Sequence, residues 1–125
     1  MKIDRLKVLI VEDQQKARMT LRHMLAEIGI NQIFEAQDGK EARNFMEVGH
    51  SLVDLVICDW NMPNATGLDL FRYISEHKKY LSFLMVTGRS DMDSIMEARN
   101  AGIRAYIRKP FSLGDLEQKI FRLIQ

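Results

Sequence analysis

The stretch VLIVED, residues 8–13, decides the fold, because an unbroken apolar run ends abruptly on two carboxylates. Four consecutive aliphatic side chains are typical of a strand buried on both faces of a parallel sheet. The segment that follows carries an apolar stripe of helical period, which ends at Gly29. The stripe consists of Ala17, Leu21, Leu25 and Ile28. A buried strand that leads into an amphipathic helix is the first half of a βαβ unit.

The same alternation recurs along the chain and predicts five strands and five helices around a parallel sheet, an α/β fold. The expected strands are Val8 to Val11, Ile33 to Ala36, Leu55 to Cys58, Phe83 to Val86 and Ala105 to Ile107. After the helix that ends at Gly29, the expected helices cover residues 39–48, 67–76 and 91–101, and a last one starts near Ser112. Its apolar stripe ends at Leu123, two residues before the C-terminus.

Length and composition predict one domain over residues 1–125, without an output domain. The chain has 125 residues, of which 46% are hydrophobic and 28% charged, as in an ordinary folded domain. A net charge of +1 gives no field that would hold nucleic acid. No apolar stretch approaches the roughly 20 residues of a membrane span, and no signal peptide is seen. The single cysteine, Cys58, lies in an apolar run and is expected to be a packed thiol in a cytoplasmic protein.

The candidate site side chains follow the first, third, fourth and fifth expected strands. They are Glu12 and Asp13 after the first, Asp59 after the third, Thr87 after the fourth and Lys109 just beyond the fifth. The carboxyl ends of parallel strands share one edge of the sheet, where ligands of such folds bind. Three carboxylates, a hydroxyl and an ammonium are therefore expected to converge.

Three carboxylates in one crevice repel one another unless a cation compensates. Oxygen ligands favour Mg²⁺ over zinc, and Mg²⁺ together with Lys109 would neutralise all three acids. A phosphoryl group on Asp59 would then meet a metal, an ammonium and the Thr87 hydroxyl, which is the arrangement that phosphoryl transfer requires.

This ordered set resembles the response-regulator receiver domains of two-component systems over essentially the whole chain. Glu12-Asp13 are similar to the acidic pair of that family, and Asp59 is similar to its phosphoacceptor. Thr87 is similar to its switch hydroxyl, and residues 109–111 are similar to its Lys-Pro-Phe turn, all in the family's order. Residues 59–64 (DWNMPN), 85–87 (MVT) and Tyr106 are most similar to the stand-alone chemotaxis regulators, which bind the flagellar motor switch.

The resemblance implies a flavodoxin-like (βα)5 fold with strand order 2-1-3-4-5. It also implies that a histidine kinase donates a phosphoryl group to Asp59. Mg²⁺ would be held by Asp13, Asp59 and the backbone carbonyl of Asn61, with Glu12 helping through water. Lys109 would contact the phosphoryl oxygens, and the peptide bond that follows Lys109 would be cis, as is common in the family.

For output, the resemblance implies that Thr87 moves toward the phosphoryl group and lets Tyr106 turn inward. Ile95, Tyr106 and Lys119 match the positions that a chemotaxis regulator presents to its target. The implied partners are the kinase, a downstream target protein such as the flagellar motor switch, and an auxiliary phosphatase.

Simpler interpretations stand beside these. Taken alone, Asp13 could be the N-cap of the first helix, and Thr87 an ordinary strand residue. Arg18 and Arg22, one turn apart, are interpreted as a solvated helix face, with a docking patch as the alternative.

Other functions also stay open. A phosphorelay intermediate would use the same residues. A phosphatase of the haloacid-dehalogenase type would need an acid and base two residues after Asp59, where this chain has Asn61. A flavodoxin would need a phosphate-binding loop rich in Ser, Thr and Gly after the first strand, and none is present. A receiver-like module that is never phosphorylated is disfavoured by the intact acidic set.

Overall fold

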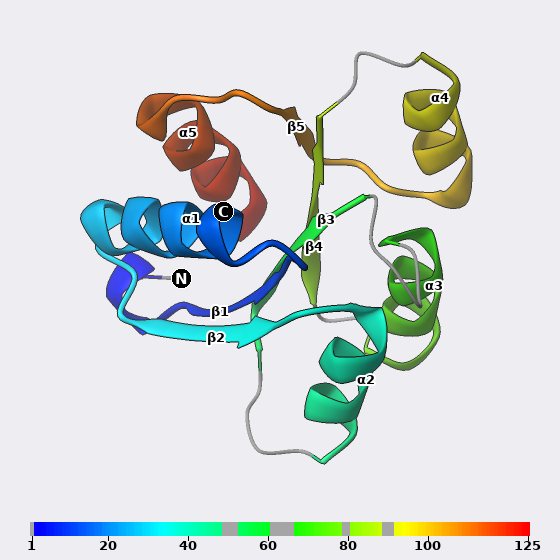
Figure 1. The fold of residues 1–125 in the computed structure, drawn as a ribbon, viewed down its shortest axis with the longest axis horizontal. Coiled ribbons are helices and arrows are strands. Elements are labelled where there is room, and N and C mark those ends of the chain that lie inside the picture. Colours follow the sequence, from blue (N-terminus) through cyan, green and yellow to red (C-terminus); the bar gives the residue numbers. More distant parts are fainter. Residues whose placement is uncertain (1, 49–52, 61–66, 79–80, 89–91) are drawn as a thin grey trace.

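A computed structural model describes residues 2–48, 53–60, 67–78, 81–88 and 92–125, which form five strands and five α-helices in alternation (Figure 1). The strands are β1 (Lys7–Val11), β2 (Gln32–Ala36), β3 (Leu55–Asp59), β4 (Ser82–Thr87) and β5 (Tyr106–Arg108). The α-helices are α1 (Gln15–Ile28), α2 (Gly39–Glu47), α3 (Gly67–His77), α4 (Met92–Ala101) and α5 (Leu113–Ile124). A short 3-10 helix, η1 (Ile3–Arg5), precedes β1 and was not predicted.

All strand pairs are parallel, and the order is β2-β1-β3-β4-β5. The α/β fold and the flavodoxin-like strand order are therefore confirmed. Helices α1 and α5 cover one face of the sheet, while α2, α3 and α4 cover the other (Figure 1). The chain moves outward from β1 to β2 and then returns to β3 on the other side of β1, so the direction of strand order reverses between β1 and β3. That is where a ligand site is expected in such a sheet.

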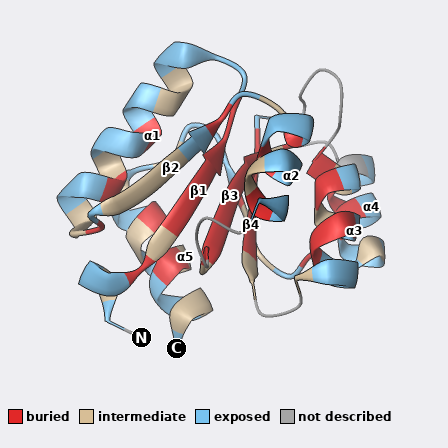
Figure 2. Cartoon of the chain, turned by 90° about the horizontal axis from the view of Figure 1, so that it is seen from below, coloured by how far each residue is buried: buried red, intermediate tan, exposed pale blue. Residues whose placement is uncertain are grey.

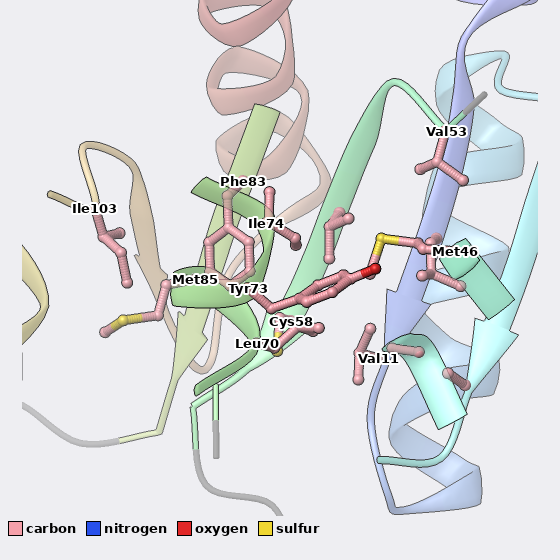
Figure 3. Close-up of a cluster of buried hydrophobic side chains, with 14 of the residues drawn as sticks. Val11, Met46, Val53, Cys58, Leu70, Tyr73, Ile74, Phe83, Met85 and Ile103 are labelled. Carbon is pink, nitrogen blue, oxygen red and sulfur yellow. The ribbon is translucent and has the colours of Figure 1, made fainter. Parts of the chain in front are cut away.

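The three central strands, β1, β3 and β4, are buried on both faces and contribute side chains to two apolar cores (Figure 2). On β1, Val8 and Ile10 point into the core under α1 and α5, whereas Leu9 and Val11 point into the core under α2 and α3. The second core contains Tyr73 of α3 (Figure 3). This alternation, which follows from the pleat of a strand, also decides toward which face the side chains at the strand ends project.

The strand boundaries agree with the sequence analysis within one residue. β5, for example, begins at Tyr106 and ends at Arg108, one residue later than expected at each end. The N-cap of α1 is Gln14, which makes no side-chain capping hydrogen bond, so the simpler interpretation of Asp13 as the cap is wrong.

The packed-thiol prediction for Cys58 is confirmed, because the side chain is fully buried and burial raises the pKa of its thiol well above the ordinary value. Within the described part of the chain, none of the helices has the length and apolar character needed to cross a membrane.

Two helix ends show how local sequence sets the boundaries. Gly29 ends α1 in the left-handed conformation, with φ of 110°, which glycine adopts without the penalty of a Cβ atom. Ser112 starts α5 with a capping box. Its hydroxyl accepts a hydrogen bond from the Asp115 backbone N–H at 3.0 Å, and its own N–H donates to the Asp115 carboxylate at 3.1 Å. Both contacts satisfy N–H groups that a helix start leaves unpaired.

We expect Ser112→Ala to lower the free energy of unfolding by about 1 kcal/mol, because the helix loses its cap. Urea denaturation followed by circular dichroism measures the change. Ser75→Ala is the matched control: Ser75 lies within α3, its hydroxyl donates to the Phe71 carbonyl, and alanine is the better helix former at such a position. Equal stabilities of the two variants would show that the capping box contributes nothing.

Candidate functional site

Three carboxylates meet at the carboxyl edge of the sheet. Glu12 and Asp13 leave the end of β1, and Asp59 is the last residue of β3. One carboxylate oxygen from each lies within 4.8 Å of those of the other two. Glu12 is buried, Asp59 is half-buried and Asp13 is exposed, so the cluster opens to solvent on one side. The convergence expected from the strand ends is present in the structure.

Glu12 is held by an ion pair and by its own loop. Lys109 Nζ donates to Glu12 Oε1 at 3.0 Å, and the Gln14 backbone N–H donates to Glu12 Oε2 at 3.0 Å. The side chain of Glu12 is only 6% exposed, against 37% for Lys109. Burial by itself raises the pKa of Glu12, but these donors outweigh it and leave the pKa below its ordinary value. Glu12 is therefore a fixed anion at the base of the site.

Asp13 is affected in the opposite direction. The neighbouring Glu12 carboxylate raises the pKa of Asp13 above its ordinary value, with a smaller contribution from partial desolvation. Two carboxylates that compete in this way favour a cation between them. The oxygen-only donor set of Glu12, Asp13 and Asp59 fits a hard divalent ion such as Mg²⁺.

Lys109 reaches the site from the loop after β5, and its backbone joins it to β4. The Lys109 N–H donates to the Thr87 carbonyl at 2.7 Å, and the Lys109–Pro110 peptide bond is cis, as the family resemblance implied. Thr87 itself is buried, with 1% of its surface exposed. Lys109 and Thr87 thus belong to one continuous backbone arrangement at the sheet edge.

A cleft of about 570 Å³ adjoins the site between α1 and the loop that precedes α5. Asp59 and Lys109 lie on its wall, together with apolar side chains that include Leu21, Met24 and Phe111. Asp59 can therefore be reached from outside, while its backbone remains in the sheet.

Gly67, the first residue of α3, was assigned in the sequence only as a helix start, and the structure gives it a further role. A Cβ atom at this position would lie 3.1 Å from the Asp59 carbonyl oxygen and 3.1 Å from the Trp60 ring. The Gly67 N–H donates to the Trp60 carbonyl at 3.3 Å, and the Trp60 N–H donates to the Val86 carbonyl at 2.9 Å. The absence of a Cβ atom lets α3 approach the backbone that carries Asp59. No sequence pattern predicts this close contact.

The residues expected to signal lie away from the carboxylates. Tyr106 is half-buried against the core that contains Tyr73, and Lys119 Nζ lies 5.7 Å from the centroid of the Tyr106 ring. Ile95 is only 4% exposed, so in this conformation it does not offer the accessible apolar anchor that the resemblance suggested. Asn61, the predicted backbone ligand of the metal, lies outside the described residues.

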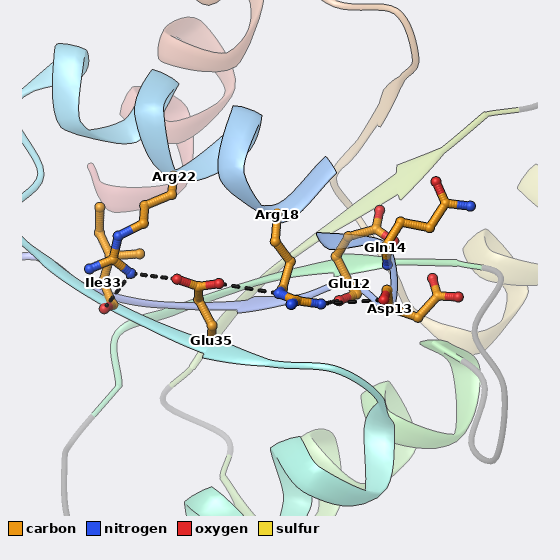
Figure 4. Close-up of polar contacts among 7 residues, drawn as sticks. All are labelled: Glu12, Asp13, Gln14, Arg18, Arg22, Ile33 and Glu35. Atoms are coloured by element: carbon orange, nitrogen blue, oxygen red, sulfur yellow. Dashed lines mark hydrogen bonds and ion pairs between the residues drawn. The ribbon is translucent and has the colours of Figure 1, made fainter. Parts of the chain in front are cut away.

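The interpretation of Arg18 as part of a solvated face is wrong. Its side chain is 13% exposed, whereas that of Arg22 is 49% exposed. The guanidinium turns inward toward β2 and the loop that carries Glu12 and Asp13 (Figure 4). Helical spacing could not reveal the inward orientation of Arg18, because its partners are backbone carbonyls and the Glu35 side chain on β2.

Comparison with known proteins gives consistent matches. The family model described as the response regulator receiver domain matches residues 8–121. The chain is 37% identical to chemotaxis protein CheY of Pseudomonas aeruginosa, over 96% of this chain and 97% of that protein. It is 36% identical to chemotaxis protein CheY-3 of Vibrio cholerae, over 96% of this chain and 92% of that protein. A solved response regulator receiver domain protein of Clostridium thermocellum superposes with a TM-score of 0.86 at 27% identity, covering 95% of this chain and 94% of the other.

We expect Lys109→Met to lower the free energy of unfolding by about 1–3 kcal/mol, because the buried Glu12 carboxylate loses its cation. The double variant Glu12→Gln, Lys109→Met should lose less unfolding free energy than the sum of the losses in Glu12→Gln and Lys109→Met. Urea denaturation without divalent cations measures the wild type, the two single variants and the double variant. Lys40→Met, at an exposed position of α2, is the control and should change stability by less than about 0.5 kcal/mol. Strictly additive losses would show that the ion pair contributes no coupling.

Proposed function

Because this chain belongs to the response-regulator receiver domain family, we propose that Asp59 is its phosphoacceptor and that the phosphoryl group comes from a histidine kinase. One observation carries the proposal: three carboxylates and the Lys109 ammonium converge at the edge of the sheet, with Asp59 at the point where strand order reverses. The family is one of signalling regulators rather than of classical enzymes.

The transfer forms an acyl phosphate. A carboxylate oxygen of Asp59 attacks the phosphorus, the P–N bond to the donor histidine breaks, and the imidazole nitrogen keeps the electron pair. The ammonium of Lys109 is held beside the site by Glu12 at 3.0 Å, where it can balance charge on the phosphoryl oxygens. The chain's contribution is thus orientation and electrostatic stabilisation. We propose that its chemistry extends only to assisting this phosphorylation and the later hydrolysis.

We further propose that Asp13, Asp59 and the Asn61 backbone carbonyl would hold Mg²⁺, with Glu12 helping through water. Bound there, the ion would neutralise the carboxylates and the incoming phosphoryl oxygens. The described part of this donor set supports the assignment, because its carboxylate oxygens lie within 4.8 Å of one another. Few protein ligands predict weak binding, with a dissociation constant on the order of a millimolar.

The pathway is proposed to be chemotaxis, because the relatives at 36–37% identity are named chemotaxis proteins. A downstream target such as the flagellar motor switch and an auxiliary phosphatase would then be partners in addition to the kinase. A phosphorelay intermediate is the alternative. A single receiver domain over residues 1–125 and a cytoplasmic location stay predictions.

The output is proposed to leave through Tyr106 and Lys119, with Ile95 becoming accessible only after a conformational change. Met85 pairs with Tyr106 across β4 and β5, so Thr87, two residues further on, is the diagonal neighbour of Tyr106 on the same face. Drawing Thr87 toward a phosphoryl group would vacate space beside Tyr106. Phosphorylation would thereby shift a two-state balance at this surface.

We expect incubation with acetyl phosphate and Mg²⁺ to add one phosphoryl group to the wild-type protein and none to Asp59→Asn, because the amide is not a nucleophile. Intact-protein mass spectrometry detects the mass gain. Asp4→Asn, in the 3-10 helix and away from the site, is the control and should be phosphorylated like the wild type. The same mass gain in Asp59→Asn would remove Asp59 from its role.

We expect Thr87→Ala to accept the phosphoryl group on Asp59 but to leave the surroundings of Tyr106 unchanged. The reason is that this variant lacks the hydroxyl that is proposed to move toward the phosphoryl group. The measurement is the NMR shift of the Tyr106 ring on addition of beryllofluoride, a phosphoryl mimic, with Mg²⁺. Ser75→Ala, at an exposed position of α3 outside the cleft, should keep the full shift. A full shift in Thr87→Ala would mean that the signal does not pass through this hydroxyl.

A further inference from the structure

The side chain of Arg18 joins three parts of the chain that meet beside the acidic cluster. Its Nε donates to Glu35 Oε1 of β2 at 3.2 Å. Its Nη1 donates to the backbone carbonyls of Glu12 at 2.9 Å and of Asp13 at 3.3 Å. Figure 4 shows the guanidinium lying between Glu35 and the loop. With 13% of its side chain exposed, Arg18 is held by protein groups far more than by water.

The orientation of the guanidinium is itself fixed. Glu35 accepts from Arg18 through one carboxylate oxygen and from Arg22 Nη1 through the other, at 2.7 Å. Arg22 also donates to the Ile33 carbonyl at 3.3 Å, and within the part of the chain that the structure describes it forms no hydrogen bond with the loop that carries Glu12 and Asp13 (Figure 4). Because the single Glu35 carboxylate is shared by two guanidinium groups, this network keeps a net charge of +1. Arg18 differs from Arg22 in its two hydrogen bonds to the loop.

Those two carbonyls belong to the residues whose carboxylates face the metal position. The Glu12 side chain has further supports in Lys109 and the Gln14 N–H, and its backbone N–H donates to the Ala36 carbonyl at 3.0 Å. Asp13 is exposed and projects into solvent beside Glu12. The direction of its carboxylate therefore depends on how the backbone at Asp13 is held, and Arg18 bonds to that backbone directly.

We propose that Arg18 is a positioning residue for the divalent cation: its guanidinium fixes the backbone of Glu12 and Asp13 so that both carboxylates face the ion. The inference rests on the proposed metal site and goes beyond it by assigning a role to a residue outside the ligand set. Groups that orient metal ligands typically account for 10-fold to 100-fold in metal affinity. The planar fork of arginine can serve Glu35 and two carbonyls together, which a lysine ammonium cannot reproduce.

The test is a titration of the full chain with MgCl₂, followed by the fluorescence of Trp60, which lies next to Asp59. We expect Arg18→Met to weaken Mg²⁺ binding about tenfold, which corresponds to about 1.4 kcal/mol. Arg22→Met is the matched control, since it removes an arginine one turn away that also pairs with Glu35, and it should change the affinity less than twofold. Arg18→Lys keeps the charge and should still bind at least threefold more weakly than the wild type.

A second measurement separates positioning from catalysis and from general destabilisation. Urea denaturation without Mg²⁺ identifies conditions in which every variant is folded, and if Arg18→Met does not fold, Arg18→Lys decides the test. The rate of phosphorylation by acetyl phosphate should require about tenfold more Mg²⁺ in Arg18→Met, while the rate at saturating Mg²⁺ stays within twofold of the wild type.

Three outcomes would overturn the proposal. Equal affinities of Arg18→Met and Arg22→Met would make Arg18 an ordinary structural arginine, and wild-type affinity of Arg18→Lys would reduce its role to charge. A loss of maximal rate with unchanged Mg²⁺ affinity would also contradict it. Asp13→Ala reports on the underlying site: if the wild type binds no Mg²⁺, or Asp13→Ala binds it equally well, the metal site is misplaced and the inference fails with it.

Discussion

The mutual repulsion of Glu12, Asp13 and Asp59 is the constraint on which the rest of this edge depends. A buried parallel sheet brings the ends of β1 and β3 side by side, and this holds the backbones that carry the carboxylates close together. Two groups from other positions stabilise the Glu12 carboxylate: the Lys109 ammonium, from the loop after β5, and the Gln14 backbone N–H. These groups fix Glu12 as an anion but leave Asp13 open to solvent. Lys109 therefore balances the negative charge of the buried Glu12, whereas the Asp13 carboxylate faces solvent.

The pleat of the strands divides the site into two halves. Ile57 and Val86 belong to the core under α1 and α5, and Asp59, two residues after Ile57, projects toward the same side. Met85 belongs to the opposite core, and Thr87 follows it by two residues. Asp59 and Thr87 therefore project from opposite faces of the sheet edge, and Tyr106 lies on the same face as Thr87. The backbone hydrogen bond from Lys109 to Thr87 joins the loop that carries the ammonium to the strand that carries this hydroxyl.

Much of this could be predicted from sequence, because it depends on local pattern. Apolar runs fixed the strands, and the polar residue after each run marked the site, so Glu12, Asp13, Asp59, Thr87 and Lys109 were placed at one edge correctly. The contacts that could not be predicted are those made by residues whose partners are distant or are backbone groups. Helical spacing predicts a surface charge at Arg18, because its carbonyl acceptors leave no trace in the sequence. The sequence predicts only a helix start at Gly67, because closeness to the Asp59 carbonyl is a property of packing. Ile95 was expected to be accessible from resemblance alone, and burial depends on how α4 lies on the sheet.

The shortness of β5 affects how another protein can attach to this side of the molecule. An edge strand normally offers a row of free N–H and C=O groups onto which a further strand can add, from any chain and almost regardless of sequence. β5 is an edge strand of three residues and ends in the exposed charge of Arg108. It therefore offers few backbone N–H and C=O groups with which a strand of another protein could pair. A protein that bound here would have to contact side chains, such as those of Tyr106 and Lys119, rather than pair with the peptide backbone. The same short length protects the sheet from edge-to-edge aggregation.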